Sequence, residues 1–372
     1  MHVLVTTDTL GGVWAYTREL VTGLHGRGIR VTLVSFGDIP LPEHTQWMDD
    51  LDGLDYRPTA FRLDWMQEGE QDHGEATSYL TALARELRPS VLHLNHLSHG
   101  NLPVKTPRIA VAHGDMISWW NAVHGCDPKD SSWLRWYRDV ITRGLRQASA
   151  VVAPSYSMLD ALQESYAWGR AGTVIYNGRN PVLFNPHLKK ENSILAVGAI
   201  LDAGKQVALL TQRTHTLPVC IVGADGNVPA PRMPIRTDVK VAVEPLCLAV
   251  KGPQTETQMR ALYSRASIFA ATARYESSGT ATIEAALSRC ALVANDTPLH
   301  REMWDDAAVY FRTNDAGSLA ETIRRVSEDR EVAQGYGNRA YQRARECFTS
   351  RRMVNEYIEL YRELMGASAV AA

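Results

Sequence analysis

Short apolar runs alternate with longer amphipathic stretches along almost the whole chain. This alternation is typical of βα units arranged around parallel sheets. The first half of the chain predicts strands at Val3–Thr7, Val31–Phe36, Val91–Asn95, Ile109–His113, Val151–Pro154 and Val174–Tyr176. The second half predicts strands at Ile194–Val197, Val219–Val222, Val239–Val243, Ile268–Ala271, Leu292–Ala294 and Val309–Phe311. The pattern therefore predicts an α/β fold with two doubly wound parallel sheets.

The segment between the two sets of strands, "NGRNPVLFNPHLKKEN", is rich in Asn, Pro and charge and has neither helical nor strand periodicity. Such a stretch is typical of a linker, so we expect a domain boundary near residue 185. Two doubly wound domains leave a cleft between them. In sheets of this kind ligands bind at the carboxyl ends of the strands, where the strand order reverses.

Composition narrows the functional class. The 372 residues are 45% hydrophobic and 22% charged, and the formal net charge of −2 gives no global attraction to nucleic acid or to membranes. The five cysteines are scattered without a CxxC pair, which indicates neither a disulfide framework nor a zinc site. The N-terminus resembles a buried strand and not a signal peptide, and no run approaches the ~20 apolar residues of a spanning helix. We therefore expect a cytoplasmic protein.

One segment, "RYESSGTATIEAALSRCALVANDTPLHREM", has the form of an anion-binding site. A strand, a loop of small residues and a helix N-terminus present free N–H groups and a positive dipole to a ligand. Glu276 and Glu284 flank this loop, and eight helical residues would separate them by roughly 12 Å. That exceeds the ~5–9.5 Å of a glycoside hydrolase carboxylate pair. The spacing suits the two ends of an extended ligand, such as the hexose and ribose of a nucleotide sugar; two unrelated glutamates on a solvated helix are the alternative.

The longer segment "YESSGTATIEAALSRCALVANDTPLHREMWDDAAVYF" resembles the donor site of retaining glycosyltransferases of family 4, which have the GT-B fold. Further segments resemble the same family in the same order: "LGGVWAYTREL", "VVAPSYSMLDAL", "VIYNGRNPVLFNP" and "VKGPQTETQMRALYSRASIFAA". The resemblance implies two Rossmann-like domains facing across a cleft. Residues 1–185 would form the acceptor-side domain and residues 186–348 the nucleotide-sugar domain. Residues 349–372 would add a helix that returns towards the first domain, followed by a frayed tail.

The resemblance also implies roles for individual residues. Glu276 would contact the donor sugar and Glu284 the ribose diol. The backbone around Ser277, Ser278, Gly279 and Thr280 would lie near the sugar and the diphosphate. The glycine loop at Gly11 and Gly12 would approach the diphosphate and the acceptor.

The family commonly places an arginine and, a few residues later, a lysine on the diphosphate. Lys205 occupies the lysine position, but Ala199 stands where the arginine is expected. Because positive charge stabilises a leaving diphosphate, the loss predicts slower turnover or a substitute cation. The candidate substitutes are Arg274, Arg301 and Arg213; a surface lysine at a helix start is the alternative for Lys205.

Aromatic and histidine side chains complete the expected site. In the family a histidine at the position of His113 reaches the donor sugar, and a histidine in the core is the alternative. Trp119 and Trp120 follow closely and are candidates for stacking on an acceptor sugar or, equally, for core packing. Spacing of three among His93, His96 and His99 suggests a metal site only superficially, since no carboxylate or cysteine completes it. We assign neither a metal nor a cofactor.

The resulting hypothesis is an enzyme that moves a hexose from a nucleoside diphosphate sugar to an acceptor hydroxyl with retention and without a metal. UDP is the default nucleotide and glucose a guess for the sugar. The acceptor would be a saccharide or glycolipid in cell-surface polysaccharide or glycolipid synthesis. A nucleotide-sugar epimerase, a donor hydrolase and a donor-binding subunit with impaired catalysis are the alternatives. A dinucleotide oxidoreductase is less credible, because the first βα turn supplies no GxGxxG.

The segment 131–148 bears on location. Its arginines cluster on one side of a helical wheel, away from most of its apolar residues. Basic amphipathic helices can lie on anionic membranes, although most are solvated faces packed on a core. We therefore expect a cytoplasmic protein with a possible peripheral contact at the inner membrane face and no nucleic-acid partner.

Overall fold

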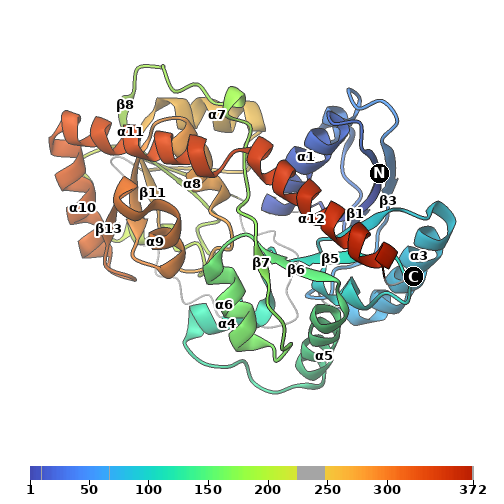
Figure 1. Cartoon of the computed structure of the whole chain (residues 1–372). Helices are drawn as coiled ribbons and strands as arrows, with labels where there is room; N and C mark the ends of the chain where they lie inside the picture. Colours follow the sequence, from blue (N-terminus) through green and yellow to red (C-terminus); the bar gives the residue numbers. More distant parts are fainter. Residues whose placement is uncertain (10, 67, 224–247, 371–372) are drawn as a thin grey trace.

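The computed structural model describes residues 1–9, 11–66, 68–223 and 248–370, and within them it contains two parallel sheets in two lobes (Figure 1). The first sheet contains β1 (His2–Asp8), β2 (Arg30–Phe36), β3 (Asp55–Pro58), β4 (Val91–Leu94), β5 (Arg108–Val111), β6 (Ala150–Ala153) and β7 (Thr173–Val174). The second contains β8 (Glu191–Val197), β9 (Val219–Val222), β10 (Leu248–Lys251), β11 (Ala266–Ala271), β12 (Ala291–Asn295) and β13 (Ala308–Phe311). The predicted α/β class with two doubly wound sheets is confirmed.

Two strands of these sheets, β3 and β10, are absent from the sequence-based prediction. Both lie at sheet edges; β3 is mostly half-buried and β10 is largely exposed. An edge strand that is not fully buried does not need the continuous apolar run by which central parallel strands are recognised; β3 has no such run and β10 only the short run Leu248–Val250. The predicted strand Val239–Val243 lies outside the described residues.

The strand order explains where a ligand site forms. The first sheet has the order β3-β2-β1-β4-β5-β6-β7 and the second β10-β9-β8-β11-β12-β13. The order reverses between β1 and β4 in one lobe and between β8 and β11 in the other. Each reversal leaves a crevice at the carboxyl ends of the strands.

The helices cover the faces of the sheets. The longer ones are α1 (Gly11–His25), α3 (Gly69–Leu87), α4 (Met116–His124), α5 (Ser132–Gln147), α6 (Tyr156–Ser165), α7 (Glu256–Arg265), α8 (Thr280–Leu287), α9 (Pro298–Trp304), α10 (Ala316–Glu328), α11 (Arg330–Cys347) and α12 (Ser350–Val370). Local caps start several of them: Ser131 caps α5, and Thr255 with Gln258 forms a capping box at α7. No helix within the described ranges is both long and apolar enough to cross the membrane.

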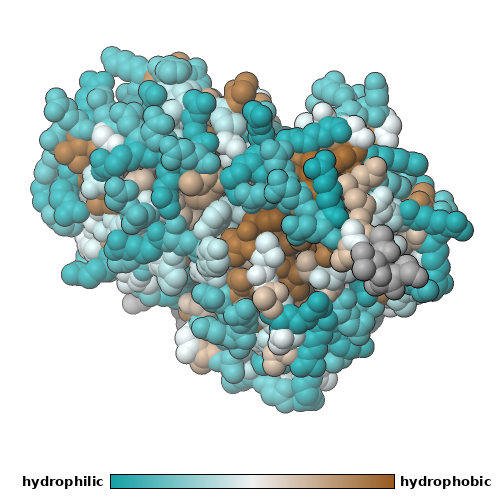
Figure 2. All heavy atoms as spheres, in the orientation of Figure 1, coloured by the Kyte–Doolittle hydropathy of each residue, from teal (hydrophilic) through white to brown (hydrophobic). Residues whose placement is uncertain are grey.

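The last helix, α12, crosses from the C-terminal lobe to the N-terminal lobe (Figure 1). Its buried residues Val354, Tyr357 and Tyr361 join the hydrophobic core on the α1 side of the first sheet. The approach to α1 requires a glycine, because a Cβ at Gly23 would lie 2.5 Å from Val354 Cγ2. Figure 2 shows a mostly hydrophilic surface on the two lobes, with hydrophobic residues gathered in the middle of this face.

Candidate functional site

A cavity of 810 Å³ lies between the lobes and is lined by residues that follow the strands at both order reversals. Its volume falls within the ~300–1,000 Å³ of small-molecule sites. Most of the residues proposed from the sequence line it: Gly11, Gly12, His113, Trp119, Lys205, Glu276, Ser277, Ser278, Thr280 and Glu284. Gly279 and Trp120 are not among the lining residues. We call this space the inter-lobe cavity.

The loop between β11 and α8 forms one wall of the inter-lobe cavity. Gly279 is the N-cap of α8 with φ +60°, and a Cβ there would lie 2.9 Å from Met303 Sδ. Both facts favour glycine at this position. Thr280 faces the glycine loop of the other lobe, since a Cβ on Gly12 would lie 4.0 Å from its Oγ1. The first N–H groups of α8 lack intrahelical partners and suit an anion.

Glu276 and Lys205 form an ion pair on this wall, with 3.2 Å between Lys205 Nζ and Glu276 Oε1. Gly198 at the end of β8 makes room for the lysine, because a Cβ there would lie 2.8 Å from Lys205 Cβ. Burial disfavours the ammonium, but the attraction of Glu276 and Asp202 prevails and raises the pKa of Lys205. The cavity therefore presents a cation next to the carboxylate expected to hold the sugar.

Glu284 lies at another part of the cavity and is held by Arg179, a buried residue of the linker. The Arg179 guanidinium lies 2.8 Å from Glu284, 3.0 Å from Glu19 on α1 and 2.9 Å from Glu256 on α7. Burial raises the pKa of Glu284, and the attraction of Arg179 opposes this rise. Glu256 also pairs with Arg18 of α1. One guanidinium thus joins both lobes and fixes Glu284.

His113 is oriented by a hydrogen-bond chain inside the N-terminal lobe. Asn95 donates through Nδ2 to the Thr6 carbonyl, so its Oδ1 accepts from His113 Nε2 at 2.9 Å. The neutral ring then has no proton on Nδ1. Burial lowers the pKa of His113 to about 3. The chain continues from Asn95 to His93, and His93 Nδ1 accepts from Tyr361 of α12 at 2.7 Å.

Hydrogen bonds between the lobes hold the loop that carries Glu276. Tyr275 Oη accepts from the Asp115 N–H at 3.1 Å and lies 2.8 Å from Ser118 Oγ. Ser277 donates through Oγ to the His113 carbonyl at 2.9 Å. The Ser277 hydroxyl is therefore engaged with the other lobe and not turned towards a ligand.

The expected second cation is not replaced by any of the three candidate arginines. Arg274 donates to the Val123 carbonyl, Arg301 pairs with Asp296, and Arg213 does not line the cavity. Ala199 lines a neighbouring cavity. Among the residues whose positions are described, Lys205 is the only lysine or arginine that lines the inter-lobe cavity.

Trp119 and Trp120 lie in different surroundings. Trp119 lies between the lobes, where a Cβ on Gly204 would come within 2.8 Å of Trp119 Nε1. Trp120 packs on His124, with 4.0 Å between ring centroids, and against the core of the N-terminal lobe. Trp120 lines neither the inter-lobe cavity nor the cavity that Ala199 lines, and its partly buried ring packs against the core, as in the core-packing alternative.

The histidines of the β4 region do not form a metal site. His96 and His99 are buried beside Phe36, whereas His93 points into the chain that ends at Tyr361. Within the described part of the chain, no group of three or more His, Cys, Asp or Glu side chains has the arrangement of a metal site.

Sequence reasoning missed three residues that shape the site. Arg179 and Asn177 belong to the segment interpreted as a linker and as a family-like stretch without a role in the site, and Asn95 ends a predicted strand. Asn177 is buried, lines the cavity, and has no hydrogen-bond partner for Oδ1 among the described residues. The one sequence signal for these residues is the "NGR" that directly follows an apolar strand. The sequence does not show whether this arginine is buried or exposed.

Comparison with known proteins is consistent with this geometry. Residues 10–182 match the family model "Glycosyltransferase Family 4" and residues 189–343 the model "Glycosyl transferases group 1". The chain is 22% identical over 218 residues to the O-antigen chain mannosyltransferase RfbU of Salmonella typhimurium, covering 55% of this chain and 58% of that relative. It therefore spans less than two thirds of the length of that curated relative.

Solved structures share the fold over nearly the whole chain. Sucrose-phosphate synthase from Thermosynechococcus elongatus matches with a TM-score of 0.75 at 17% identity, covering 99% of this chain and 100% of that one. HepE from Anabaena, in complex with UDP and glucose, matches with a TM-score of 0.72 at 15% identity, covering 98% and 100%. With both halves matched by family models and the two-sheet architecture shared, the chain belongs to the glycosyltransferases of family 4, which have the GT-B fold.

Proposed function

We propose that the protein transfers a hexose from a UDP-sugar to an acceptor hydroxyl, with retention of anomeric configuration. Lys205 and the N-terminus of α8 hold the diphosphate, and Glu284 holds the ribose. Glu276 and His113 hold the sugar. The acceptor class that the sequence resemblance favours is a saccharide or glycolipid of cell-surface synthesis.

The observation that carries this proposal is the pairing of acidic residues and cations around one cavity. Glu276, Lys205 and Glu284 line the inter-lobe cavity beside the start of α8; Glu276 pairs with Lys205, and Glu284 pairs with the buried Arg179 behind the cavity wall. Two separately tethered carboxylates suit the two hydroxyl-bearing ends of a nucleotide sugar. The cation and the helix N-terminus between the lobes suit the diphosphate that joins these ends.

The chemistry proposed is displacement on one face of the sugar. The bond between the anomeric carbon and the diphosphate oxygen breaks as the acceptor oxygen attacks from the same face. The leaving diphosphate takes the acceptor proton, so no side-chain base is needed. Positive charge aimed at the diphosphate lowers the barrier by stabilising the charge that develops there.

The test is turnover of UDP-glucose by Glu276→Ala with a panel of acceptors. We expect kcat to fall at least 10³-fold while the fold stays intact, because the sugar loses its carboxylate contact. Glu86→Ala, an exposed glutamate on α3, is the matched control and should behave as wild type. Wild-type-like turnover by Glu276→Ala would refute the assignment, and a product of inverted configuration by NMR would refute retention.

One alternative has an observation in its favour. Ala199 stands where the arginine is expected, and Lys205 is the only lysine or arginine among the described residues that line the inter-lobe cavity. A donor-binding subunit with impaired catalysis fits this deficit. Calorimetric binding of UDP-sugars without turnover on any acceptor would support that alternative over transfer, and conversion of the donor without acceptor would indicate an epimerase or hydrolase.

We also propose a cytoplasmic location with peripheral contact to the inner membrane face through α5. The apolar side of α5 is buried in the N-terminal lobe, and two of its exposed arginines, Arg135 and Arg143, pair with neighbouring aspartates. The contact would therefore depend on electrostatic attraction to anionic headgroups. Failure to co-sediment with anionic lipid vesicles at low salt would contradict it.

A further inference from the structure

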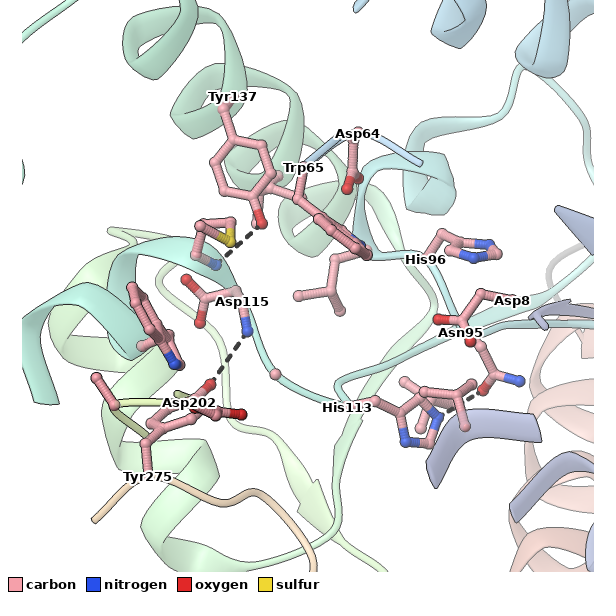
Figure 3. A pocket seen from close by; sticks show the side chains of 18 of the residues that line it. Asp8, Asp64, Trp65, Asn95, His96, His113, Asp115, Tyr137, Asp202 and Tyr275 are labelled. Atoms are coloured by element: carbon pink, nitrogen blue, oxygen red, sulfur yellow. Dashed lines mark hydrogen bonds between the residues drawn. The ribbon is translucent and has the colours of Figure 1, made fainter. Parts of the chain in front are cut away.

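A second cavity of 500 Å³ adjoins the inter-lobe cavity on the side of the N-terminal lobe (Figure 3). Five residues line both spaces: Val13, His113, Trp119, Asp202 and Tyr275. Figure 3 shows Asp64, Trp65 and Tyr137 at the end remote from His113. A molecule in this second cavity would therefore reach the sugar side of the donor through the region of His113. We call this space the side cavity.

The walls of the side cavity are mainly apolar. They come from five parts of the N-terminal lobe, represented by Trp65, Leu97, Val111, Met116 and Ile141. Leu201, an exposed residue of the C-terminal lobe, adds an apolar side chain at the edge of the side cavity. An apolar ligand gains about 25 cal/mol for each Å² that such walls remove from water.

Several polar groups of the side cavity are engaged within the protein, whereas the two ring nitrogens of His96 have no hydrogen-bond partner among the described residues. Tyr137 Oη accepts from the Met116 N–H at 3.3 Å. Asp115 caps α4 by accepting from the Ile117 and Ser118 N–H groups at 2.9 and 3.0 Å, and it also accepts from Tyr166 Oη at 2.8 Å. A saccharide needs many hydrogen bonds to replace its water, and these occupied groups do not supply them.

The charges around the side cavity have one sign. The four charged residues that line it are Asp8, Asp64, Asp115 and Asp202, and no lysine or arginine is found among its described lining residues. Burial raises the pKa of Asp64 to about 6, which leaves this carboxylate mostly ionised above neutral pH. Burial lowers the pKa of His96 to about 4, so its ring is uncharged. An anion entering this space meets repulsion without a compensating cation.

We propose that the side cavity binds the acceptor and selects an uncharged, predominantly apolar alcohol or phenol, such as a ring or lipid alcohol. A free saccharide and an acceptor with a phosphate or carboxylate would be disfavoured. This inference rests on the proposed transfer from a UDP-sugar to a hydroxyl, and it replaces the saccharide or glycolipid acceptor considered there with an apolar alcohol. The acceptor hydroxyl enters past His113, while the apolar body occupies the space walled by Trp65, Met116 and Ile141.

Binding of three probes without donor tests the inference first. The probes are 2-naphthol, its carboxylated analogue 6-hydroxy-2-naphthoate, and maltose, each titrated calorimetrically at pH 7.5. We expect 2-naphthol to bind at least tenfold more tightly than either of the others. Equal or tighter binding of the carboxylate or of maltose, or no binding of 2-naphthol, would overturn the inference.

Variants locate the binding site. Leu201→Arg places a cation at the edge of the side cavity and should reduce the preference for 2-naphthol over its carboxylated analogue at least fivefold. Leu188→Arg changes an exposed leucine that lines neither the side cavity nor the inter-lobe cavity and is the matched control. Trp65→Ala should weaken 2-naphthol binding while leaving UDP-glucose binding unchanged. An unchanged preference in Leu201→Arg together with unchanged binding in Trp65→Ala would exclude the side cavity as the site.

Transfer separates this inference from the proposed function. UDP-glucose with 2-naphthol should yield naphthyl glucoside, with kcat/KM at least tenfold above that for the carboxylated analogue. A protein that binds 2-naphthol but neither binds nor consumes any UDP-sugar would refute the proposed function and with it the acceptor role. A protein that transfers glucose to maltose but not to 2-naphthol would keep the proposed function and refute the apolar acceptor.

Discussion

At the scale of single residues, Lys205 is the residue of the inter-lobe cavity from which the proposed function requires most. It pairs with Glu276 and lies beside Asp202, whose Oδ1 accepts from the Lys205 N–H at 3.1 Å. In the proposed donor complex the same ammonium would hold the diphosphate. With Ala199 in place of the expected arginine, no other lysine or arginine among the described lining residues shares this task.

Replacing Lys205 should therefore reduce turnover more than binding. We expect Lys205→Ala to lower kcat by about 10²-fold to 10³-fold, the usual effect of losing one preorganised charge donor. Lys205→Arg should retain more activity because it keeps the charge. Steady-state kinetics with UDP-glucose measures both.

Arg301→Ala is the control for this experiment. Arg301 is exposed, pairs with Asp296 and does not line the inter-lobe cavity. Its substitution should leave kcat within about threefold of wild type. If Lys205→Ala also stays within that range, the diphosphate is held by other groups.

At the scale of elements, β4 and the turn after it bring two histidines into the interior of the N-terminal lobe. Burial lowers the pKa of His93 to about 3 and that of His96 to about 4. In the unfolded chain both histidines have a pKa of ~6.5. Between these values the unfolded state binds protons that the folded state does not, so acid destabilises the fold.

The stability of the protein should fall as the pH drops below about 6.5, because protonation then favours the unfolded chain. Each buried histidine contributes a slope of about 1.4 kcal/mol per pH unit until its folded pKa is approached. The slope should decrease by about that amount in His96→Leu, whose ring nitrogens have no hydrogen-bond partner among the described residues. Urea unfolding at pH 7.5, 6.5, 5.5 and 4.5 measures these slopes.

The exposed His187 serves as the control, and His187→Leu should keep the wild-type slope. An identical slope in His96→Leu and wild type would show that this histidine is not kept neutral by burial. The free energy of unfolding at pH 7.5 is compared separately, since the leucine also changes packing.

At the scale of the whole molecule, the two segments that connect the lobes, one around Arg179 and one around Thr349, lie side by side. The Arg179 N–H donates to the Phe348 carbonyl, and the Ser350 N–H donates to the Arg179 carbonyl, both at 3.0 Å. A Cβ on Gly178 would lie 2.3 Å from the Thr349 carbonyl carbon. The Arg179 side chain then reaches α1, α7 and α8, so backbone and side chain of one residue join the lobes.

Removing the guanidinium should weaken the whole assembly. We expect Arg179→Met to lower the free energy of unfolding by about 3–5 kcal/mol, because it leaves buried carboxylates without their cation. UDP binding should also weaken, since Glu284 loses the partner that fixes it. Urea unfolding and calorimetric titration with UDP measure the two effects.

Arg265→Met is the matched control, because Arg265 is exposed and its nitrogen lies 3.7 Å from Glu191. A surface pair of this kind contributes ~0–1 kcal/mol. If Arg179→Met destabilises the protein no more than Arg265→Met does, the proposed joint between the lobes is wrong.

The central architecture of the molecule could be predicted because its signals are local. Buried parallel strands require consecutive apolar residues, and the runs at β1, β2, β8 and β11 are such strands in the structure. The loop before α8 was recognisable for the same reason, since a glycine at its N-cap and small residues around it are consecutive in the chain. The edge strand β3 (DYRP) lacks this signal, whereas β10 (LAVK) has a short apolar run that the prediction did not include.

The sequence by itself thus determined the α/β class, the two sets of strands and the position of the glycine-containing loop before α8, because each depends on residues within one or two turns of chain. The tertiary structure alone decided that Arg179 fixes Glu284, that Asn95 orients His113, and that Trp120 packs, partly buried, against the core. It also decided the apolar, acidic character of the side cavity. These features depend on contacts between residues far apart in the chain, and such contacts leave no periodic trace in the sequence.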